Sequence, residues 1–485
     1  MTAALMLQGT ASNAGKSLLV AGLCRHFTNQ GLTVRPFKPQ NMSNNAAATP
    51  DGGEIGRAQA LQALACRAPL DVDMNPVLLK PSSERGAQVV VQGRVLTTCN
   101  ARDYHTLKPR LMAAVLESFR RLQQAADLVV VEGAGSPAEV NLRAGDIANM
   151  GFAVEAGVPV ILAGDIERGG VIAQLVGTTA LLEAAELRLV KGYIVNKFRG
   201  DPALFDNAHP IIRARTGLEN LGVVPWFEAA AELPAEDVLG LTGKVLPGGL
   251  KIVVPRLPRI SNFDDLDPLR LEPDTELVIL EPGEAIPGDT DLVLLPGSKA
   301  TRADLATLVA KGWDIDILAH HRRGGFVLGL CGGYQMLGRM VHDPDGLEGE
   351  PGSSPGLGLL DVETTLAPVK TVRQTRAVDL GTGLEVEGYE IHQGLTEGPD
   401  TARPMLHLDH GNDGAVAPDG RVMGAYLHGL FASDAFRHAF LSRIRAREAS
   451  DLAYAARIDK VLDDLAAHLA THLDTARIEA IAGLR

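Results

Sequence analysis

Short apolar segments alternate with longer stretches of helical pattern throughout the first half of this 485-residue chain. Each apolar segment is bounded by glycine, proline or a polar turn, and the stretches between them are long enough for crossover helices. This alternation is typical of a parallel β-sheet that is covered by helices on both faces. The expected strands are 4–7, 34–38, 127–132, 158–163 and 192–196.

A second series of the same kind follows a region rich in proline and glycine near 225–250. Its expected strands are 251–254, 276–280, 291–295, 325–330 and 424–428. Two domains are also expected from length, because a single core rarely grows beyond about 250–300 residues.

We therefore predict an α/β fold with two doubly wound domains. The first domain spans 1–235 and has a parallel sheet, a linker spans 236–250, and the second domain spans 251–447. Leucine and isoleucine then recur at helical spacing, which predicts a helical C-terminal tail over 448–485 that packs on the body of the protein.

Composition argues against several classes of protein. The formal net charge is -13 and aromatic residues make up 4% of the chain, whereas nucleic-acid binding needs a basic face and stacking rings. The four cysteines form no CxxC pair, so neither a disulfide framework nor a zinc site is expected. The chain has neither a signal-peptide start nor an apolar run near the ~20 residues that cross a bilayer. We expect a cytoplasmic protein that binds neither nucleic acid nor membranes.

The segment Gly-Thr-Ala-Ser-Asn-Ala-Gly-Lys-Ser lies between the first expected strand and an apolar helix. A loop in this position directs backbone N–H groups and the helix dipole at a phosphate, while its lysine and hydroxyl groups serve phosphate and magnesium. Thr10 stands where the strict pattern has its first glycine, and this variant spacing resembles the loop of dethiobiotin synthetase and its relatives, which often activate carboxylates. The segment predicts an ATP site. Its candidate residues are Gly9, Thr10, Ser12, Asn13, Gly15, Lys16 and Ser17.

Polar residues near other strand ends belong to the same predicted site. Glu132 ends an expected strand where a Mg²⁺ ligand would lie, with Ser17 as its partner. Glu54 is a second candidate for the metal, or else a turn residue. Lys38 would neutralise a transferred phosphoryl group, or else it is a solvated lysine. Asn196 occupies a position from which such folds contact adenine, unless it only turns the chain.

Cys331 lies at the end of an expected strand and precedes two glycines that permit a tight turn into a helix. The N-terminus of that helix favours the thiolate, which is the form that attacks a carboxamide. The pattern Gly-x-Cys-x-Gly-x-Gln resembles the nucleophile segment of class I glutamine amidotransferases, whose domain has a flavodoxin-like fold. By that resemblance, Gln335 helps to hold glutamine and the backbone N–H of Gly332 forms half of an oxyanion hole. The segment that contains Gly297 resembles the other oxyanion loop of these enzymes.

A catalytic cysteine of this kind needs a histidine partner from elsewhere in the chain. His428 follows the last strand of the second domain and matches the amidotransferase histidine. Many class I enzymes have an acid two residues later, whereas this chain has Leu430 there. Either Cys331 and His428 act as a pair, or another acid such as Glu390 orients the ring.

Longer segments along both domains strongly resemble the cobyric acid synthase family. They are 7–12, 37–42, 74–81, 132–139, 165–170, 196–201 and 331–338. The resemblance implies an ATP-dependent and Mg²⁺-dependent ligase that takes ammonia from glutamine and amidates the b, d, e and g carboxylates of adenosylcobyrinic acid a,c-diamide in cobalamin biosynthesis. Residues of these segments that could face the corrinoid are Asn41, Ser43, Asn75, Lys80, Arg168 and Arg199.

Two other functions are weighed against this one. Cobyrinic acid a,c-diamide synthase has both domain types and amidates other carboxylates, although segments 37–42 and 196–201 favour cobyric acid synthase. A partition-type ATPase switch has no use for Cys331 and His428, and it commonly has an additional lysine early in the loop, where this chain has none.

Overall fold

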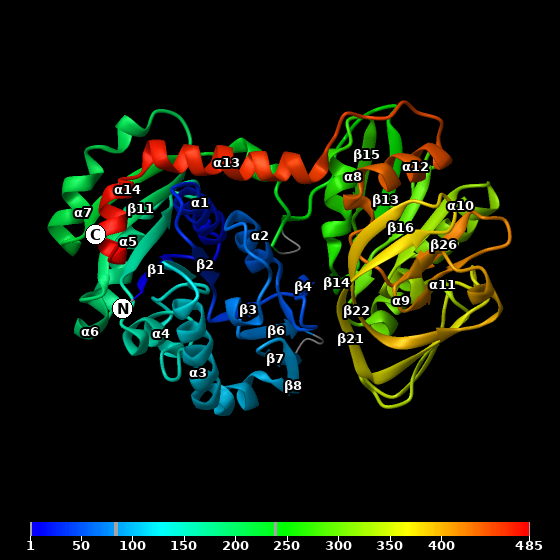
Figure 1. The fold of residues 1–485 in the computed structure, drawn as a ribbon, viewed down its shortest axis with the longest axis horizontal. Helices are drawn as coiled ribbons and strands as arrows, with labels where there is room; N and C mark the ends of the chain where they lie inside the picture. The colour runs from blue at the N-terminus through cyan, green and yellow to red at the C-terminus, as the bar shows by residue number, and fades with distance from the viewer. Residues whose placement is uncertain (1, 82–85, 237–239, 485) are drawn as a thin grey trace.

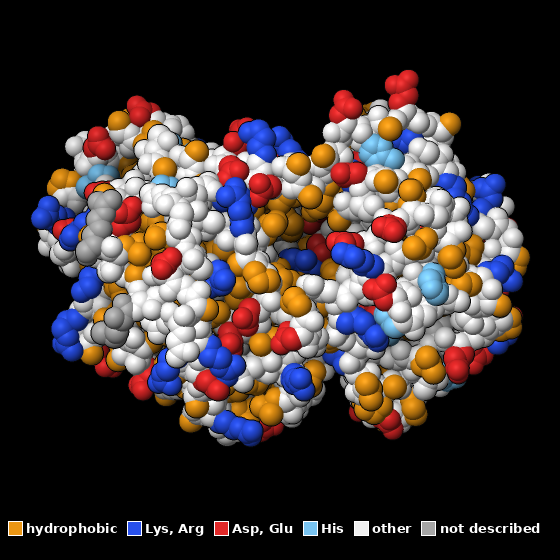
Figure 2. Space-filling model, viewed as in Figure 1, with side chains coloured by type: hydrophobic (Ala, Val, Ile, Leu, Met, Phe, Trp, Pro, Cys, Tyr) orange, Lys and Arg blue, Asp and Glu red, His pale blue; other side chains and the backbone are white. Residues whose placement is uncertain are grey.

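The computed structural model describes residues 2–81, 86–236 and 240–484. Two bodies lie side by side, and helix α13 (Tyr454–His472) runs along the top of the view from the second body to the first (Figure 1). Figure 2 shows acidic and basic side chains interspersed over the visible face, with a notch between the two bodies. None of the described helices is both long enough and apolar enough to span a membrane.

The first body is built around a six-stranded sheet in which all neighbouring strands are parallel, as predicted. From edge to edge its strands are β12 (Glu219–Pro225), β11 (Val190–Phe198), β10 (Val160–Asp165), β1 (Ala3–Gly9), β9 (Leu128–Glu132) and β2 (Val34–Phe37). Its helices are α1 (Lys16–Asn29), α2 (Arg57–Ala65), α3 (Ala101–Gln124), α4 (Met150–Ala156), α5 (Val171–Leu181), α6 (Ala184–Leu187) and α7 (Ala208–Thr216).

The sheet has a separate apolar core on each face. Leu5 and Val130 belong to one cluster of buried side chains, whereas Met6 and Val131 belong to the other. Neighbouring residues of a strand point to opposite faces, so continuously apolar strands supply both cores. This arrangement is the doubly wound architecture that the sequence predicts.

A smaller set of strands faces the second body and was not expected from the sequence. One sheet contains β3 (Gln40–Met42), β6 (Val77–Pro81), β7 (Gly86–Val91) and β8 (Arg94–Asn100), and a hairpin pairs β4 (Ala46–Ala48) with β5 (Glu54–Gly56). Ala46 and Leu78 pack in one apolar cluster with Tyr389 and Ile391 of the second body. These short strands therefore form the docking surface between the bodies.

The second body contains a six-stranded sheet that is parallel except at one edge. Its strands in order are β15 (Thr275–Leu280), β13 (Leu250–Pro255), β16 (Leu292–Leu295), β18 (Phe326–Leu330), β26 (Val422–Ala425) and the antiparallel β25 (Ala415–Val416). Its helices are α8 (Asp267–Leu271), α9 (Thr301–Ala310), α10 (Trp313–Arg322), α11 (Gly332–Leu337) and α12 (Asp434–Ile444).

A further, mostly antiparallel sheet in this body presents a long hairpin to the first body. It contains β19 (Met340–Asp343), β20 (Gly352–Pro355), β21 (Glu363–Asp379), β22 (Glu385–Glu397), β23 (Leu406–Leu408) and β24 (Gly411–Asp413). A two-stranded pairing of β14 (Ile260–Ser261) with β17 (Gly297–Ser298) joins two loops at the carboxyl ends of the parallel strands.

The C-terminal tail packs on the first body rather than on the second body that precedes it. Helix α13 lies against α1, and a Cβ atom on Gly22 would come within 2.5 Å of Leu469 Cδ1, so a side chain there would push the helices apart. The helix predicted from the leucine spacing is present as α13, although Leu452 lies before its first residue and Leu473 just after its last. Helix α14 (Thr475–Ala482) follows and contacts β1 and β12.

Candidate active site

The glycine-rich loop joins the end of β1 to the start of α1, as its sequence predicts. Gly15 has φ 83°, and a Cβ atom there would lie 2.4 Å from the side-chain nitrogen of Asn196. Lys16 bends back over the loop and donates to the carbonyl oxygens of Ala11 and Ser12 at 3.3 and 3.2 Å. Burial lowers the pKa of Lys16. Lys16 also donates to the carbonyl oxygen of Gly135, after β9, at 3.1 Å. Because all three acceptors are backbone carbonyls, its N–H groups are placed to transfer to a phosphate oxygen.

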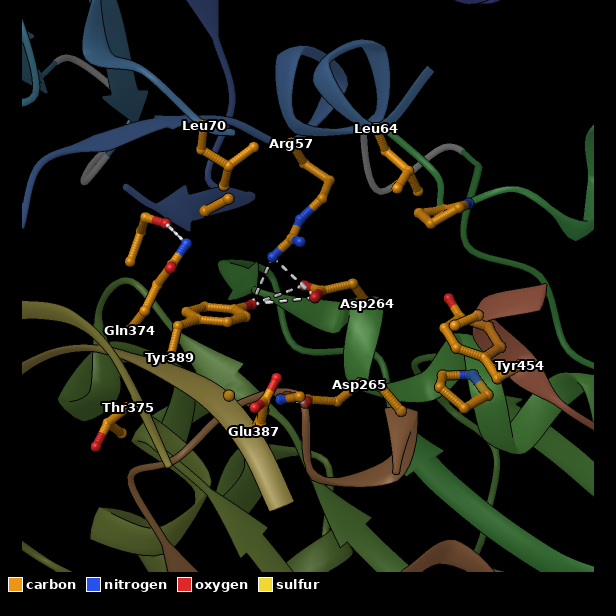
Figure 3. Close-up of a pocket in the computed structure, with 18 of the residues that line it drawn as sticks. Arg57, Leu64, Leu70, Asp264, Asp265, Gln374, Thr375, Glu387, Tyr389 and Tyr454 are labelled. Carbon is orange, nitrogen blue, oxygen red and sulfur yellow. Dashed lines mark hydrogen bonds and ion pairs between the residues drawn. The ribbon is translucent and has the colours of Figure 1, made fainter. Parts of the chain in front are cut away.

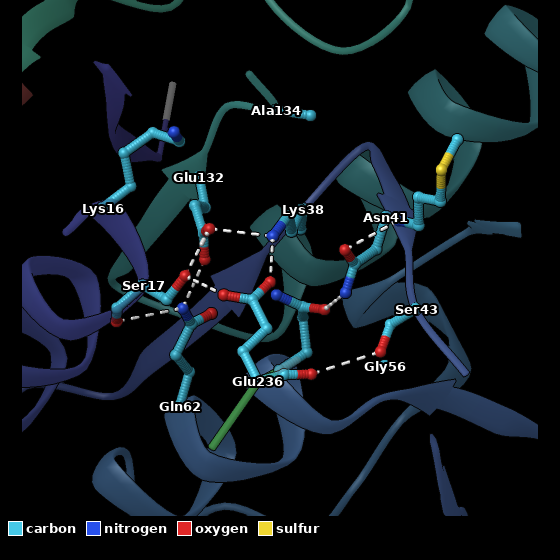
Figure 4. A network of polar contacts seen from close by, with 12 residues as sticks. Lys16, Ser17, Lys38, Asn41, Ser43, Gly56, Gln62, Glu132, Ala134 and Glu236 are labelled. Carbon is cyan, nitrogen blue, oxygen red and sulfur yellow. Dashed lines mark hydrogen bonds and ion pairs between the residues drawn. The ribbon is translucent and has the colours of Figure 1, made fainter. Parts of the chain in front are cut away.

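A network of charged side chains lies beside this loop, and Figure 4 shows its members pointing toward one another. Lys38 Nζ lies 2.8 Å from Glu132 Oε1 and 2.7 Å from Glu236 Oε1. Ser17 Oγ lies 2.7 Å from Glu132 and 2.5 Å from Glu236, and Gln62 donates to the other oxygen of Glu132 at 2.6 Å. The structure therefore brings together Ser17, Lys38 and Glu132, three residues that the sequence places at the ends of separate strands or loops.

Lys38 and Glu236 stabilise each other's charged forms in this network. Burial opposes the charge on Glu236, but Lys38 and Ser17 more than offset this effect and lower its pKa. Burial also opposes the charge on Lys38, and Glu132 and Glu236 together raise its pKa. Anionic oxygens that face one hydroxyl group suit a hard cation such as Mg²⁺. In the described part of the chain no three His, Cys, Asp or Glu side chains form a metal cage, so such an ion would also need phosphate or water ligands.

Glu54 does not join this network, so the structure gives no support to it as a magnesium ligand. It forms ion pairs with Lys80, at 2.8 Å, and with Lys370 of the second body. Burial would raise the pKa of Glu54, but the two ammonium groups lower it to about 2. Glu236 takes the place that we expected Glu54 to have, and it comes from the segment that we predicted to be a linker.

Asn196 lies against the loop rather than apart from it. Its side chain donates to the carbonyl oxygen of Ala14 at 2.9 Å, while Thr10 donates to Gln174 at 2.9 Å. Ser12 and Asn13 are exposed at the tip of the loop. A largely apolar cavity of about 200 Å³ opens beside it. Its lining includes Gly15, Asn196, Trp226, Phe227, Leu465 and Leu469, the last two from α13. A flat, apolar base fits such a cavity.

The residues expected to face a corrinoid are scattered. Asn75 holds backbone groups around β6, and Lys80 is paired with Glu54. Arg168 is exposed, and Arg199 lies 3.9 Å from the centre of the Trp226 ring. Ser43 lies beside the charged network, where its hydroxyl donates to the backbone carbonyl oxygen of Glu236 at 3.3 Å, and Asn41 lies close by (Figure 4). The corrinoid contacts stay a prediction.

Cys331 occupies a sharp turn between β18 and α11. Its φ is 53°, which is uncommon for a residue with a side chain. A Cβ atom on Gly333 would lie 2.1 Å from the carbonyl oxygen of Leu295, so only glycine fits at that position. A Cβ atom on Gly332 would lie 2.7 Å from the backbone nitrogen of Ser298. The backbones of these two segments therefore lie close together beside Cys331, as an oxyanion hole requires.

Gln335 and Gly297 both lie at this site. Gln335 is anchored by Thr301, at 2.9 Å, and by the carbonyl oxygen of Gln393, at 2.9 Å, and it lines one pocket with Cys331. Gly297 is so close to His428 that a Cβ atom there would lie 3.3 Å from the imidazole Cε1 atom. The second body thus gathers all five residues that the sequence assigns to glutamine hydrolysis.

Asp265, which the sequence analysis did not single out, orients His428. Its Oδ2 atom lies 2.7 Å from His428 Nδ1, and its Oδ1 atom accepts the backbone N–H of Gly429 at 2.6 Å. His428 is fully buried, and its Nε2 atom has no hydrogen-bond partner among the described residues. Burial would lower the pKa of His428, but Asp265 and Cys331 raise it to about 10. The Nε2 side of the ring is therefore available to exchange a proton with Cys331 or its substrate.

Glu390 is not the orienting acid. It forms ion pairs with Arg373, His392 and His410 at 3.1, 3.4 and 3.1 Å. The position two residues after His428 is Leu430, which is buried in a short 3₁₀ turn and cannot act as an acid. Asp265 instead comes from a 3₁₀ turn, η6 (Phe263–Leu266), far upstream in the sequence. The only sequence signal for this role is the pair of neighbouring acids in that turn, Asp264 and Asp265.

A residue of the first body reaches almost to His428. Arg57 lies 2.8 Å from Asp264 and donates to the hydroxyl oxygen of Tyr389 at 2.6 Å, and Figure 3 shows it pointing between them. The Tyr389 ring stacks on His428 with 5.2 Å between ring centres. Asp264 is also the immediate neighbour of Asp265. Through Arg57, the first body therefore contacts both Tyr389, which stacks on the His428 ring, and Asp264, the neighbour of the acid that orients it.

Comparison with known proteins agrees with this division into two sites. Residues 5–239 match the family model of the CobQ/CobB/MinD/ParA nucleotide binding domain, and residues 251–436 match that of the CobB/CobQ-like glutamine amidotransferase domain. The chain is 62% identical over 479 residues to the cobyric acid synthase of Rhodobacter capsulatus, with 99% of each chain covered. It is also 62% identical over 479 residues to that of Paracoccus denitrificans, with 99% of each chain covered, and 60% identical over 482 residues to that of Bradyrhizobium diazoefficiens, with 99% and 100% covered.

These relatives align from end to end, through both the nucleotide-binding half and the half that contains Cys331 and His428. This chain belongs to the cobyric acid synthase family, a family of glutamine-dependent ligases that carry out amidation in cobalamin biosynthesis.

Proposed function

We propose that this protein uses ATP and glutamine to amidate the b, d, e and g carboxylates of adenosylcobyrinic acid a,c-diamide. The observation that best supports this function is the presence of two complete sets of polar groups in one chain. One set is Ser17, Lys38 and Glu132 beside a phosphate-binding loop, and the other is Cys331 with His428 and Asp265. The second set has no use in a protein that only switches between partners.

The nucleotide-binding half converts a carboxylate into an electrophile. A carboxylate anion repels nucleophiles, and transfer of a phosphoryl group from ATP gives an acyl phosphate that ammonia can attack. Lys16 and the loop N–H groups would bind the phosphates, and Lys38 would follow the negative charge as it moves to the acceptor. A magnesium ion held by Ser17 and Glu132 would neutralise phosphate charge. The apolar cavity beside Asn196 would receive the base.

The amidotransferase half supplies ammonia. The Cys331 thiolate attacks the side-chain carbonyl carbon of glutamine, and the N–H groups near Gly332 and Ser298 stabilise the oxyanion. His428 then protonates the departing ammonia, and in the second half of the reaction it takes a proton from the water that cleaves the thioester. Asp265 holds the imidazole ring in the orientation that both steps need.

Two measurements test this proposal. After incubation with the a,c-diamide, ATP and glutamine, mass spectrometry should show successive replacement of carboxylates by amides. Products that stop before any amide forms, or turnover of cobyrinic acid instead, would contradict the substrate assignment. Cys331→Ala should abolish turnover with glutamine and retain turnover with ammonium salts, and equal activity with glutamine would exclude the role given to Cys331.

A further inference from the structure

Three lysines surround the pocket that contains Cys331, and the mechanism above uses none of them. Lys80 comes from β6 of the first body, Lys299 follows β17, and Lys370 lies on β21. All three line the same pocket as Cys331 and Gln335. Lys80 is 2% exposed, and the side chain of Lys370 is 12% exposed. A concentration of buried and half-buried ammonium groups this close to a reactive centre needs a physical reason.

The pocket has fewer ionised carboxylates than ammonium groups. Glu54 pairs with both Lys80 and Lys370, whereas Lys299 has no ion pair with any residue that the structure describes. The other acid, Glu348, accepts the backbone N–H of Thr301 at 2.6 Å, and burial raises its pKa to about 7. Three lysines therefore face a single carboxylate, Glu54, that is fully ionised at neutral pH.

This excess is costly in the absence of an anion. Burial, together with repulsion from Lys80 and Lys299, outweighs the attraction of Glu54 and lowers the pKa of Lys370 to about 7. Burial and repulsion from Lys80 also lower the pKa of Lys299. Buried charges are stable only when they are paired, so the cluster is suited to an anionic ligand that enters from outside.

Glutamine has one anionic group, and the reaction fixes where it must lie. Cys331 and the nearby N–H groups hold the side-chain amide, so the α-carbon end of the substrate extends into the rest of the pocket. Resting on the glutamine hydrolysis proposed above, we propose that Lys80, Lys299 and Lys370 bind the α-carboxylate of glutamine. Glu348, beside Lys299, would then receive the α-ammonium group.

This assignment makes the glutamine site a joint product of the two bodies. Lys80 and Glu54 both belong to the first body, and the ion pair between Glu54 and Lys370 crosses the interface. The amidotransferase half alone would lack one of the three cations. Affinity for glutamine therefore depends on docking against the nucleotide-binding half, which limits wasteful hydrolysis when the bodies separate.

The test compares glutamine with 4-aminobutanamide, which is glutamine without its α-carboxylate. The wild-type full-length protein should release ammonia from glutamine with a kcat/KM at least about 100-fold higher, because charge-assisted hydrogen bonds to the carboxylate are lost in the analogue. Lys299→Met is the sharpest variant, since it leaves no carboxylate unpaired. It should raise KM for glutamine by about 10- to 150-fold and leave turnover of the analogue nearly unchanged.

Lys80→Met should produce the same loss of discrimination from across the interface. Lys311→Met removes an exposed lysine of the second body, which also contains Lys299, and serves as the matched control, with unchanged kinetics. If Lys299→Met and Lys80→Met lowered activity toward glutamine and the analogue equally, the lysines would have only a structural role and the proposal would be wrong. Unchanged KM for glutamine would also overturn it. If the wild type released no ammonia from glutamine yet amidated with ammonium salts, the proposed glutaminase function itself would fail.

Discussion

Replacing Asp265 with asparagine tests the buried contact that orients His428. The pKa of His428 is about 10 against an ordinary 6.5, even though burial opposes the increase. The difference of about 3.5 units corresponds to about 5 kcal/mol in favour of the imidazolium ion, at 1.36 kcal/mol per unit. Cys331 supplies part of this stabilisation and burial offsets part of it, so about 5 kcal/mol is a net preference, which we take as the upper end of the range expected for Asp265. The lower bound is the ~1.5 kcal/mol of a charge-assisted hydrogen bond.

These bounds predict a reduction in glutaminase kcat/KM of between roughly 10-fold and roughly 5,000-fold in Asp265→Asn. An asparagine amide can donate to Nδ1, which favours the tautomer whose Nε2 already bears a proton and cannot accept another. The assay is ammonia release from glutamine, with amidation from ammonium salts measured on the same preparation to show that the fold is intact.

Glu390→Gln is the informative comparison, because Glu390 was the acid considered from sequence. We expect the glutaminase activity of Glu390→Gln to stay within about threefold of wild type. The acid that this change neutralises pairs with Arg373, His392 and His410, and not with His428. Activity of Asp265→Asn within that range, or a loss of activity in Glu390→Gln that is selective for glutamine, would show that Asp265 is not the acid that orients His428.

Three further predictions concern the charged groups at the two sites. Glu132→Gln should lower ATP-dependent amidation by at least about 100-fold and leave ammonia release from glutamine intact, and parallel loss of both activities would contradict separate roles. Arg57→Met leaves Asp264 buried without its cation, which should cost about 3–5 kcal/mol at the interface and shift the urea midpoint downward; an unchanged midpoint would show that the ion pair contributes nothing. Because the pKa of His428 is raised, its contribution to stability is full below pH 6.5 and is lost as the pH rises toward 10. The stability advantage of wild type over Asp265→Asn should therefore shrink between these values in urea titrations, and an advantage that grows with pH would contradict the ion pair.

Local sequence predicts the two loops well, and the alternation of apolar segments with helical stretches predicts the fold class. The turn at Cys331 and the loop before Lys16 are each built from consecutive residues, so their glycines and strand context are readable in one segment. The parallel sheets are predictable for a similar reason, because strands buried on both faces are continuously apolar. The short strands β3 to β8 are less apparent, since several span only three residues and have no alternating pattern.

Residues that join the sites from distant segments are not predictable in this way. Asp265 reaches His428 across 163 residues of sequence, and Glu236 reaches Ser17 across 219. Glu54 illustrates the converse, because an acid near glycines fits a metal site in sequence but pairs with two lysines in the folded chain. The domain boundaries also stay predictions. Glu236, the first residue of the expected linker, contacts Ser17 and Lys38 in the network beside the phosphate-binding loop.

The central claim is that the two sites serve one divided reaction, and the fate of the glutamine nitrogen tests it most directly. The protein would be supplied with the a,c-diamide, ATP, glutamine labelled with ¹⁵N in its side-chain amide, and unlabelled ammonium, and the corrinoid product would be analysed by mass spectrometry. Wild type should form amides that contain ¹⁵N, and Cys331→Ala should form amides that contain only unlabelled nitrogen. Labelled amides from Cys331→Ala, or the absence of corrinoid amides from wild type with either nitrogen source, would show that the two sites do not share one reaction.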